Sequence, residues 1–261
     1  VIREMSREAV KYGAVNLGQG FPDFSAPEDI KLKAIEAIAA DRNQYAITWG
    51  VKSFRDAIAK KTMWFLGLDL DPEAEITVTC GSTEGMIAAM MATVDPGDEV
   101  VIPAPYWVSY PDMVSLADGE PVIVPCDEQN GWKLTPEQLA AALTPSTRWL
   151  ILNSPGNPTG AIYSEQELRA LAAVLADYPQ VLVMADDIYE PLRYDNIPFT
   201  TFAQAAPQMV SRTLTVNGVS KSHAMTGWRL GYAGGPQWLI AAMQILQSQS
   251  TSNPSSISQA A

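Results

Sequence analysis

Short apolar runs alternate with longer amphipathic stretches along most of the chain. Seven such runs, rich in branched and aromatic residues, predict strands at residues 76–79, 99–102, 122–124, 149–152, 181–184, 214–216 and 230–233. They show no clean apolar–polar alternation, which is typical of strands that are covered on both faces. The pattern therefore predicts an α/β fold, with a mostly parallel sheet flanked by helices in three α/β/α layers.

Helices are predicted where start or stop signals accompany helical spacing. Ahead of the sheet, a capping box at residues 25–28 predicts one helix, and a second is expected from Ser53 to Leu66, with Gly67 as its stop. Later helices are expected at residues 84–93, 106–117, from 135 onward, 164–176 and 236–250, and a new one at the end of the chain. Ser164 and Glu167 have the spacing of another capping box.

The composition of the chain argues against several classes of protein. The 261 residues carry a net charge of −12, which argues against a general nucleic-acid binder. No apolar run approaches the ~18 residues of a membrane span, and the first residues lack a signal peptide's apolar core. Cys80 and Cys126 lack zinc-site spacing and are expected to be reduced thiols of a cytoplasmic protein. The single histidine, His223, argues against Ser-His-Asp chemistry and His-rich metal sites, so no metal is expected and His223 is interpreted as structural or solvated.

The stretch 218–231 carries the strongest chemical signal. Lys221 is flanked there by small residues, and Arg229 follows eight residues later. Small neighbours let a planar ligand approach the amine, and a partly desolvated lysine can lose its proton and attack an aldehyde. The planar guanidinium of Arg229 can hold an anionic end of the same ligand. Pyridoxal phosphate has both an aldehyde and a phosphate, so this stretch predicts a site for that cofactor.

Several other unusual residues directly follow predicted strands, at the sheet edge where α/β proteins bind ligands. Ser82 and Thr83 begin a helix, whose free N–H groups can cradle a phosphate, although many ordinary turns look similar. Trp107 can stack on a planar ring, with a half-buried core tryptophan as the alternative. Asn157 lies in a loop of prolines and glycines, either as a directed hydrogen-bond donor or as the cap of a turn.

Asp186 follows the strand predicted at 181–184. A carboxylate at such a position is costly unless it is paired, and a pyridinium N–H would pair it. Tyr189 lies three residues further on and can reach the same ligand. Asp187 is expected to tolerate asparagine better than Asp186.

The order and spacing of these residues indicate a protein family more specifically than any single residue does. Asn157, Asp186, Lys221 and Arg229 are separated by 29, 35 and 8 residues. This arrangement resembles the fold-type-I, pyridoxal-phosphate-dependent aminotransferases of class I/II, and is most like their bacterial aspartate-aminotransferase-like branch. Segments 16–24 and 105–111 also match, and the resemblance covers essentially the whole chain.

The resemblance implies an enzyme that exchanges an amino group between an amino acid and a 2-oxo acid. Lys221 would bind the cofactor's aldehyde covalently and later move a proton of the substrate. Asp186 would keep the pyridine nitrogen protonated. Asn157 and Tyr189 would hydrogen-bond the ring oxygen.

Further roles are implied for the rest of the site. Trp107 would stack on the ring, and the backbone of Gly20 would lie near the substrate's α-carboxylate, so that Gly20, Trp107 and Asn157 contact the substrate. The cofactor's phosphate would bind Ser82, Thr83 and Arg229. Tyr45 would reach the phosphate of a neighbouring subunit, which implies a homodimer with shared sites.

The resemblance also divides the chain into domains. Residues 1–27 would belong with a small domain, and residues 28–261 would form the large cofactor-binding domain. Most of the small domain, with the arginine that grips the α-carboxylate, is expected beyond Ala261. Without it, this chain is expected to bind the cofactor but to transaminate poorly. Both positions that clamp a dicarboxylate side chain, Thr83 and Ser248, depart from aspartate enzymes, so the preferred amino acid is left open.

Two other functions fit the same cofactor residues. A pyridoxal-phosphate lyase or cyclising enzyme of this fold would differ only in its substrate contacts, and would release pyruvate or ammonia. A non-catalytic cofactor-binding module of a regulator would carry a basic DNA-binding segment upstream of residue 1.

Overall fold

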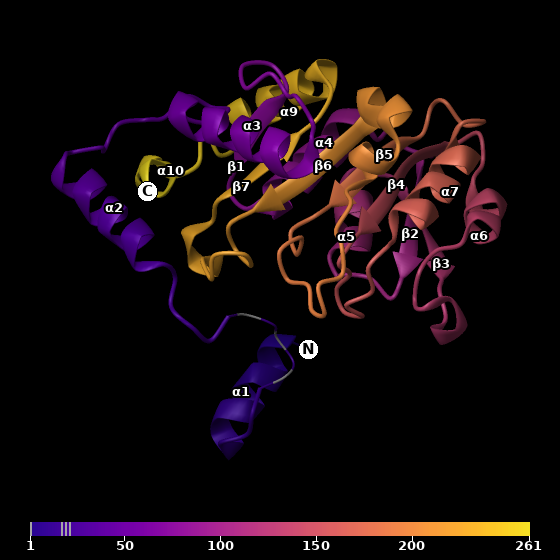
Figure 1. Ribbon diagram of the computed structural model, residues 1–261, viewed down its shortest axis with the longest axis horizontal. Helices are drawn as coiled ribbons and strands as arrows, with labels where there is room; N and C mark the ends of the chain where they lie inside the picture. Colours follow the sequence, from indigo (N-terminus) through magenta and orange to yellow (C-terminus); the bar gives the residue numbers. More distant parts are fainter. Residues whose placement is uncertain (1, 17, 19, 21) are drawn as a thin grey trace.

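The computed structural model describes residues 2–16, 18, 20 and 22–261. Within them, seven strands form one sheet in the order β1-β7-β6-β5-β4-β2-β3 (Figure 1). The strands are β1 Ile76–Thr79, β2 Glu99–Ala104, β3 Glu120–Pro125, β4 Thr147–Asn153, β5 Leu182–Asp186, β6 Thr213–Gly218 and β7 Gly231–Gly234. All neighbours are parallel except for β7, which runs antiparallel to both β1 and β6. The predicted mostly parallel sheet and its seven strands are confirmed.

Helices cover both faces of the sheet (Figure 1). Their bounds are α1 Ile2–Tyr12, α2 Glu28–Ala39, α3 Lys52–Leu66, α4 Ser82–Thr93, α5 Tyr110–Leu116, α6 Pro136–Ala142, α7 Glu165–Leu175, α8 Phe202–Ala205, α9 Gln237–Gln249 and α10 Ser256–Ala260. Three short 3-10 helices lie at Glu128–Asn130, Pro207–Arg212 and Thr226–Trp228. The three-layer arrangement is therefore confirmed.

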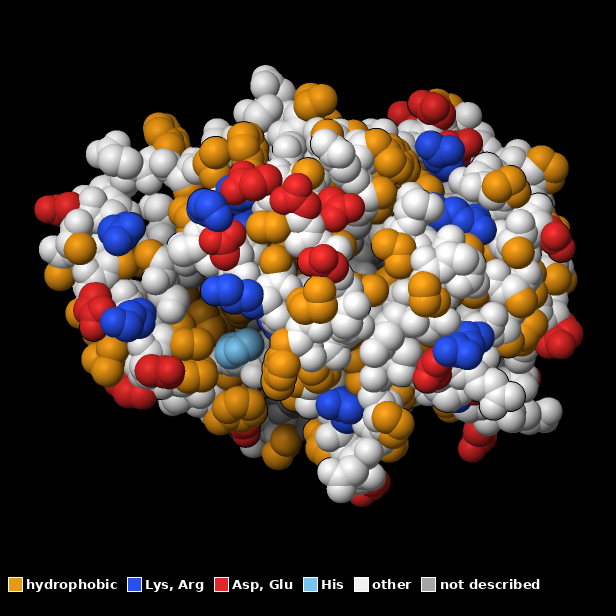
Figure 2. All heavy atoms as spheres, turned by 45° about the horizontal axis from the view of Figure 1, so that its top comes forward, with side chains coloured by type: hydrophobic (Ala, Val, Ile, Leu, Met, Phe, Trp, Pro, Cys, Tyr) orange, Lys and Arg blue, Asp and Glu red, His pale blue; other side chains and the backbone are white. Residues whose placement is uncertain are grey.

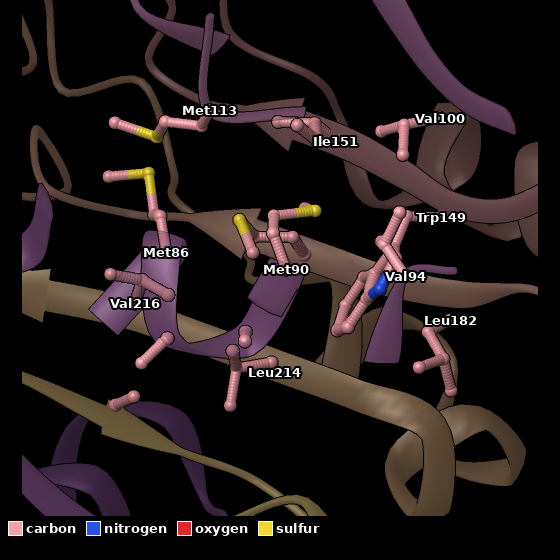
Figure 3. Close-up of a cluster of buried hydrophobic side chains, with 14 of the residues drawn as sticks. Met86, Met90, Val94, Val100, Met113, Trp149, Ile151, Leu182, Leu214 and Val216 are labelled. Carbon is pink, nitrogen blue, oxygen red and sulfur yellow. The ribbon is translucent and has the colours of Figure 1, made fainter. Parts of the chain in front are cut away.

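Alternate residues of the central strands enter different cores. On β5, Met184 packs with residues of α4, α5 and α9, whereas Val183 and Ala185 pack with residues of α6, α7 and α8. Figure 3 shows part of the first core, in which Met86 and Met90 of α4 lie over the sheet. Because every strand residue points to one side or the other, both faces are apolar, which explains the uninterrupted apolar runs of the sequence.

Local signals placed several helix ends correctly. Ser164 and Glu167 form the predicted capping box at α7, since each side chain accepts a hydrogen bond from the other residue's backbone N–H. Thr135 caps α6 in the same way, with Gln138 as its partner. Gly67 ends α3 in the left-handed conformation, with φ at 67°.

Two predictions for helices were wrong, and one helix was not predicted. The capping box at residues 25–28 does not form, because α2 begins at Glu28 with Pro27 as its N-cap, and no side chain caps it. The helix predicted from residue 106 begins at Tyr110, because Pro111 fits only the first turn of a helix. Helix α1 was not predicted; it lies apart from the sheet and its covering helices (Figure 1).

Two predictions from composition can be compared with the structure. Cys80 and Cys126 are both free, as predicted. Among the described residues, no helix is long and apolar enough to cross a membrane. The matching segment 16–24 includes Leu17, Gln19 and Phe21, which lie outside the described residues.

Candidate active site

The carboxyl ends of β4, β5 and β6 lie side by side because these strands are parallel neighbours. Asn153, the last residue of β4, is in register with Asp186, the last residue of β5. Asp186 is in turn in register with Val216, near the end of β6. The loops that follow these strands carry Asn157, Tyr189 and Lys221. Residues far apart in the sequence are thereby brought to one edge of the sheet.

Asp186 is 3% exposed and is held by several donors. Tyr110 donates its hydroxyl proton to Oδ2 at 2.6 Å, and the backbone N–H of Ile188 donates to Oδ1 at 3.3 Å. Asn153 Nδ2 donates to the Asp186 carbonyl at 2.8 Å. Burial raises the pKa of Asp186 to about 6, while Tyr110, Ile188 and the positive charge of Lys221 oppose the rise. A pKa of about 6 leaves the carboxyl group mostly ionised at pH 7.

Tyr189 lies between Asn157 and Lys221. Asn157 Nδ2 donates to the Tyr189 hydroxyl at 3.4 Å, and the Asn157 backbone is fixed by a 2.7 Å bond from its N–H to Asn153 Oδ1. The Lys221 amine is 5.9 Å from the centre of the Tyr189 ring. Burial raises the pKa of the Tyr189 hydroxyl, and the charge of Asp186 adds to the rise. Asn157 and Tyr189 thus present polar groups beside the lysine.

Lys221 is half-buried, with its amine facing the N-terminal segment. Its Nζ donates to the carbonyl of Gly20 at 3.4 Å. Burial lowers the pKa of Lys221, the charge of Arg229 lowers it further, and Asp186 opposes both. A lowered pKa increases the share of neutral amine, which is the form that attacks a carbonyl carbon.

The start of α4 forms a cradle that could hold an anion. No side chain caps this helix, so its first N–H groups are available at Ser82 and Thr83. Gly81 precedes them with φ at 78°, and a Cβ atom there would lie 2.3 Å from the Arg229 guanidinium. A Cβ on Gly231 would lie 2.4 Å from the backbone nitrogen of Ser82. Two glycines thus let a guanidinium and a strand approach the helix start closely.

Replacing Gly231 with alanine is expected to displace this cradle. The added Cβ would overlap backbone atoms of Gly81 and Ser82, and overpacking of this kind costs about 1–3 kcal/mol. We expect a melting temperature lower by several degrees and weaker binding of pyridoxal phosphate, measured by thermal unfolding and absorbance titration. The matched control is Gly227→Ala, because no atom lies within 4 Å of a Cβ on Gly227. Equal effects of the two variants would contradict the account of the cradle.

Two of the predicted residues lie around this centre in different ways. Trp107 is partly buried and meets Tyr110 edge-on, with ring centres 5.5 Å apart and an angle of 85° between the rings. Since Tyr110 binds Asp186, Trp107 is close to the candidate site. Tyr45 lies between α2 and α3 and is 89% exposed. No contact between Tyr45 and the other candidate residues is seen in the part of the chain that the structure describes.

Sequence reasoning assigned no role to Tyr110 or Asn153. Both contact Asp186, and Asn153 also fixes the loop that carries Asn157. Asn153 had a usable signal, because an amide at the carboxyl end of a buried strand faces the same edge as Asp186. Tyr110 lies inside the family-like segment 105–111. Its hydrogen bond to Asp186 joins residues that are 76 positions apart, so no local sequence pattern indicates it.

The fold, the carboxylate, the lysine and the anion cradle define a class of protein. Residues 12–261 match the family "Aminotransferase class I and II". The chain belongs to this family. In the described residues, no group of three or more His, Cys, Asp or Glu side chains could hold a metal ion.

Individual relatives are similar over nearly the whole chain. The aspartate/prephenate aminotransferase of Cereibacter sphaeroides is 52% identical over 260 residues, which are 99% of this chain and 65% of the relative. The aspartate aminotransferase of Rhizobium meliloti is 51% identical over 245 residues, or 94% of this chain and 60% of the relative. The chain thus spans about three fifths to two thirds of the length of these relatives.

Solved structures agree with this membership. The crystal structure of a Rhizobium meliloti aspartate aminotransferase has a TM-score of 0.95 and 49% identity, covering 99% of this chain and 65% of that one. The aspartate aminotransferase of Thermus thermophilus with maleate has a TM-score of 0.93 and 41% identity, covering 99% and 67%. The predicted family and fold are confirmed.

Proposed function

We propose that the intact protein is a pyridoxal-phosphate-dependent aminotransferase that exchanges an amino group between an amino acid and a 2-oxo acid. One observation carries the proposal. A buried, ionised carboxylate on Asp186 and a half-buried amine on Lys221 lie at one sheet edge, next to an uncapped helix start that Arg229 approaches. A single ligand that carries a cationic group, an aldehyde and a phosphate would satisfy these three features together.

The donors and acceptors present fit this cofactor. Ser82, Thr83 and Arg229 would hold its phosphate. Gly81 and Gly231 lack the Cβ atoms that would overlap the Arg229 guanidinium and the Ser82 backbone, so these groups can lie close together. Asp186 would pair with a protonated ring nitrogen, and Asn157 and Tyr189 would hydrogen-bond the ring oxygen. When bound, the cofactor supplies an electron-accepting ring that stabilises negative charge at the substrate's α-carbon. Trp107 would cover a face of that ring.

The residues of the chain would then have separate tasks. Asp186 would pair with a protonated ring nitrogen, while Tyr110 fixes the carboxylate's direction. Lys221 would hold the cofactor through its aldehyde carbon and would move a proton to or from the substrate's α-carbon; burial lowers the pKa of its amine, which favours both tasks. The carbonyl of Gly20, 3.4 Å from the Lys221 amine, places the N-terminal segment beside the reacting groups, which supports a substrate contact there.

The substrate proposed first is aspartate, because the relatives in C. sphaeroides and R. meliloti are named for it. Neither of the two positions that depart from aspartate enzymes supplies a positive charge. Thr83 has an uncharged side chain, and Ser248 is exposed on α9, with its hydroxyl bonded to the Ile245 carbonyl. The clamp for a second carboxylate would therefore have to come from other residues.

A homodimer with shared sites belongs to the same proposal. Tyr45 is almost fully exposed, as expected of a side chain that completes a neighbour's phosphate site. Leu32, Ile35 and Ile38 of α2 are also more than half exposed, and apolar side chains gather at several places on the face seen in Figure 2. The separate position of α1 supports assigning residues 1–27 to a small domain and residues 28–261 to the large one. A cytoplasmic location, supported by two free thiols, completes the proposal.

A half-reaction on the full-length protein tests the proposed activity. The cofactor-loaded protein is mixed with aspartate and other amino acids without a 2-oxo acid. We expect the cofactor to be converted to its amine form, seen by absorbance, with one equivalent of 2-oxo acid released. Release of ammonia with the cofactor unchanged would indicate a lyase instead. Binding without turnover of any amino acid would favour a non-catalytic module.

A further inference from the structure

Asp187 follows Asp186 directly and is equally buried, at 3% exposure. Its backbone N–H still pairs with the Val216 carbonyl of β6 at 2.9 Å, so the chain remains extended at this point. Successive residues of extended chain point to opposite faces of a sheet. Asp186 points to the face of Tyr110 and α5, and Asp187 therefore points to the other face, where α3 lies.

The two carboxyl groups receive very different numbers of donors. Asp186 accepts hydrogen bonds from Tyr110 and Ile188 and is attracted by Lys221, all of which favour its ionised form. Among the described residues, Asp187 Oδ2 and the hydroxyl of Thr201 have no hydrogen-bond partner of normal geometry, although the Thr201 hydroxyl is close enough to favour the ionised form of Asp187 and so to oppose part of the effect of burial. A buried carboxylate with so few donors is disfavoured, whereas a protonated carboxyl group supplies a donor of its own.

The charges around Asp187 add to this difference. Asp186 on the same strand end and Glu190 on the following turn both repel a charge on Asp187. Lys61 of α3 attracts one, but its amine is already paired with Glu190 Oε1. Tyr232 of β7 faces both Asp187 and Glu190 and carries no charge at neutral pH, since its pKa is raised well above its usual range.

We propose that Asp187 is protonated at neutral pH in the folded protein, so that the strand end carries a single negative charge, on Asp186. The proton makes Asp187 a donor toward the buried hydroxyl oxygen of Thr201, which lacks a partner of normal geometry. The turn that follows, closed by the bond from Glu190 N–H to the Asp187 carbonyl at 2.9 Å, carries Tyr189 toward Lys221.

The protonation itself does not depend on the proposed function, although its consequence for a ring nitrogen at Asp186 does. Two adjacent charged carboxylates would repel each other within a buried strand end. With Asp187 neutral, the charge that faces the cofactor side comes from Asp186 alone, whose pKa of about 6 keeps it ionised. The end of β5 thus holds a protonated acid, Asp187, and an ionised base, Asp186, on opposite faces of the sheet.

The contribution of Asp187 to the stability of the folded protein should decrease as the pH rises. Burial raises the pKa of Asp187 well above its usual range, with repulsion from Glu190 and Asp186 added to it, while the Thr201 hydroxyl and the charge of Lys61 oppose the rise. Because the folded pKa exceeds the unfolded one, the stabilising effect of the proton is complete below the unfolded pKa and is lost as pH rises toward the folded pKa. Asparagine at this position keeps the shape and the neutral state but has no proton to lose.

The test compares wild type with Asp187→Asn and with Asp186→Asn as the matched control, all without cofactor. At pH 7 the infrared band of a protonated carboxyl group should be present in wild type and Asp186→Asn and absent in Asp187→Asn. The melting temperature of Asp187→Asn relative to wild type should increase steadily from pH 5 to pH 8.

Either of two results would overturn the proposal. One is the absence of the protonated-carboxyl band from wild type, which does not depend on how well the variant folds. The other is a relative melting temperature of Asp187→Asn that stays constant or falls as pH rises, since asparagine would then be replacing an ionised, paired carboxylate. Because no cofactor is present, failure here would leave the aminotransferase proposal to its own half-reaction test.

Discussion

Replacing Asp186 with alanine is expected to slow the half-reaction with an amino acid by at least about 10²–10³-fold, the usual effect of removing one preorganised electrostatic partner. The carboxylate lies in a buried setting where Tyr110 and Ile188 hold it in one direction, so water would replace it poorly. Cofactor capture should suffer less, because Lys221 and the cradle at the start of α4 remain. Stopped-flow absorbance of the cofactor-loaded, full-length protein measures the rate.

The control for this experiment is Asp177→Ala, which removes an exposed aspartate and should leave the rate unchanged. Half-reaction rates of Asp186→Ala within a few-fold of wild type would contradict the role given to Asp186. In that case the buried carboxylate would serve the fold alone, and its variant should show a changed melting temperature without a changed rate.

Replacing Lys221 with alanine should have an even larger effect, because one side chain is given two tasks. Loss of general acid–base catalysis alone typically costs about 10²–10⁴-fold, and the covalent attachment of the cofactor is lost as well. We expect the variant to bind the cofactor only noncovalently and to show no measurable half-reaction. Borohydride reduction followed by gel filtration in denaturant, with absorbance detection, separates covalent from noncovalent binding.

Lys60→Ala is the matched control, since Lys60 is exposed on α3. It should retain the cofactor through gel filtration and react at the wild-type rate. If Lys221→Ala also keeps the cofactor bound and reacts at a normal rate, another amine must perform both tasks.

The positions of the strands could be predicted because the information for them is local, whereas the strand order and the antiparallel direction of β7 could not. A run such as residues 149–152 is apolar at every position, since Trp149 and Ile151 enter one core while Leu150 and Leu152 enter the other. Helix ends were harder, because a local signal competes with its neighbours. The Ser25–Glu28 spacing was overridden when Pro27 became the N-cap of α2.

The candidate site was predictable as far as its residues follow strands. That Asn157 and Asp186 follow strands, and so lie at the carboxyl edge of a mostly parallel sheet, could be inferred from the sequence, whereas Lys221 was predicted from its own motif and the adjacency of the three strands comes from the structure. The bond from Tyr110 to Asp186 depends on how α5 packs on the sheet, which no local pattern encodes. The burial of Asp187 on the opposite face likewise became visible only when α3 was placed over it.

The identity of the lysine that binds the cofactor tests the central claim most directly. Full-length protein loaded with pyridoxal phosphate is reduced with borohydride, digested, and analysed by mass spectrometry for the fixed cofactor. The account predicts a label on Lys221, the half-buried amine near Gly20 and Tyr189. A label on Lys52, Lys60 or Lys61 instead would contradict the whole assignment of the site.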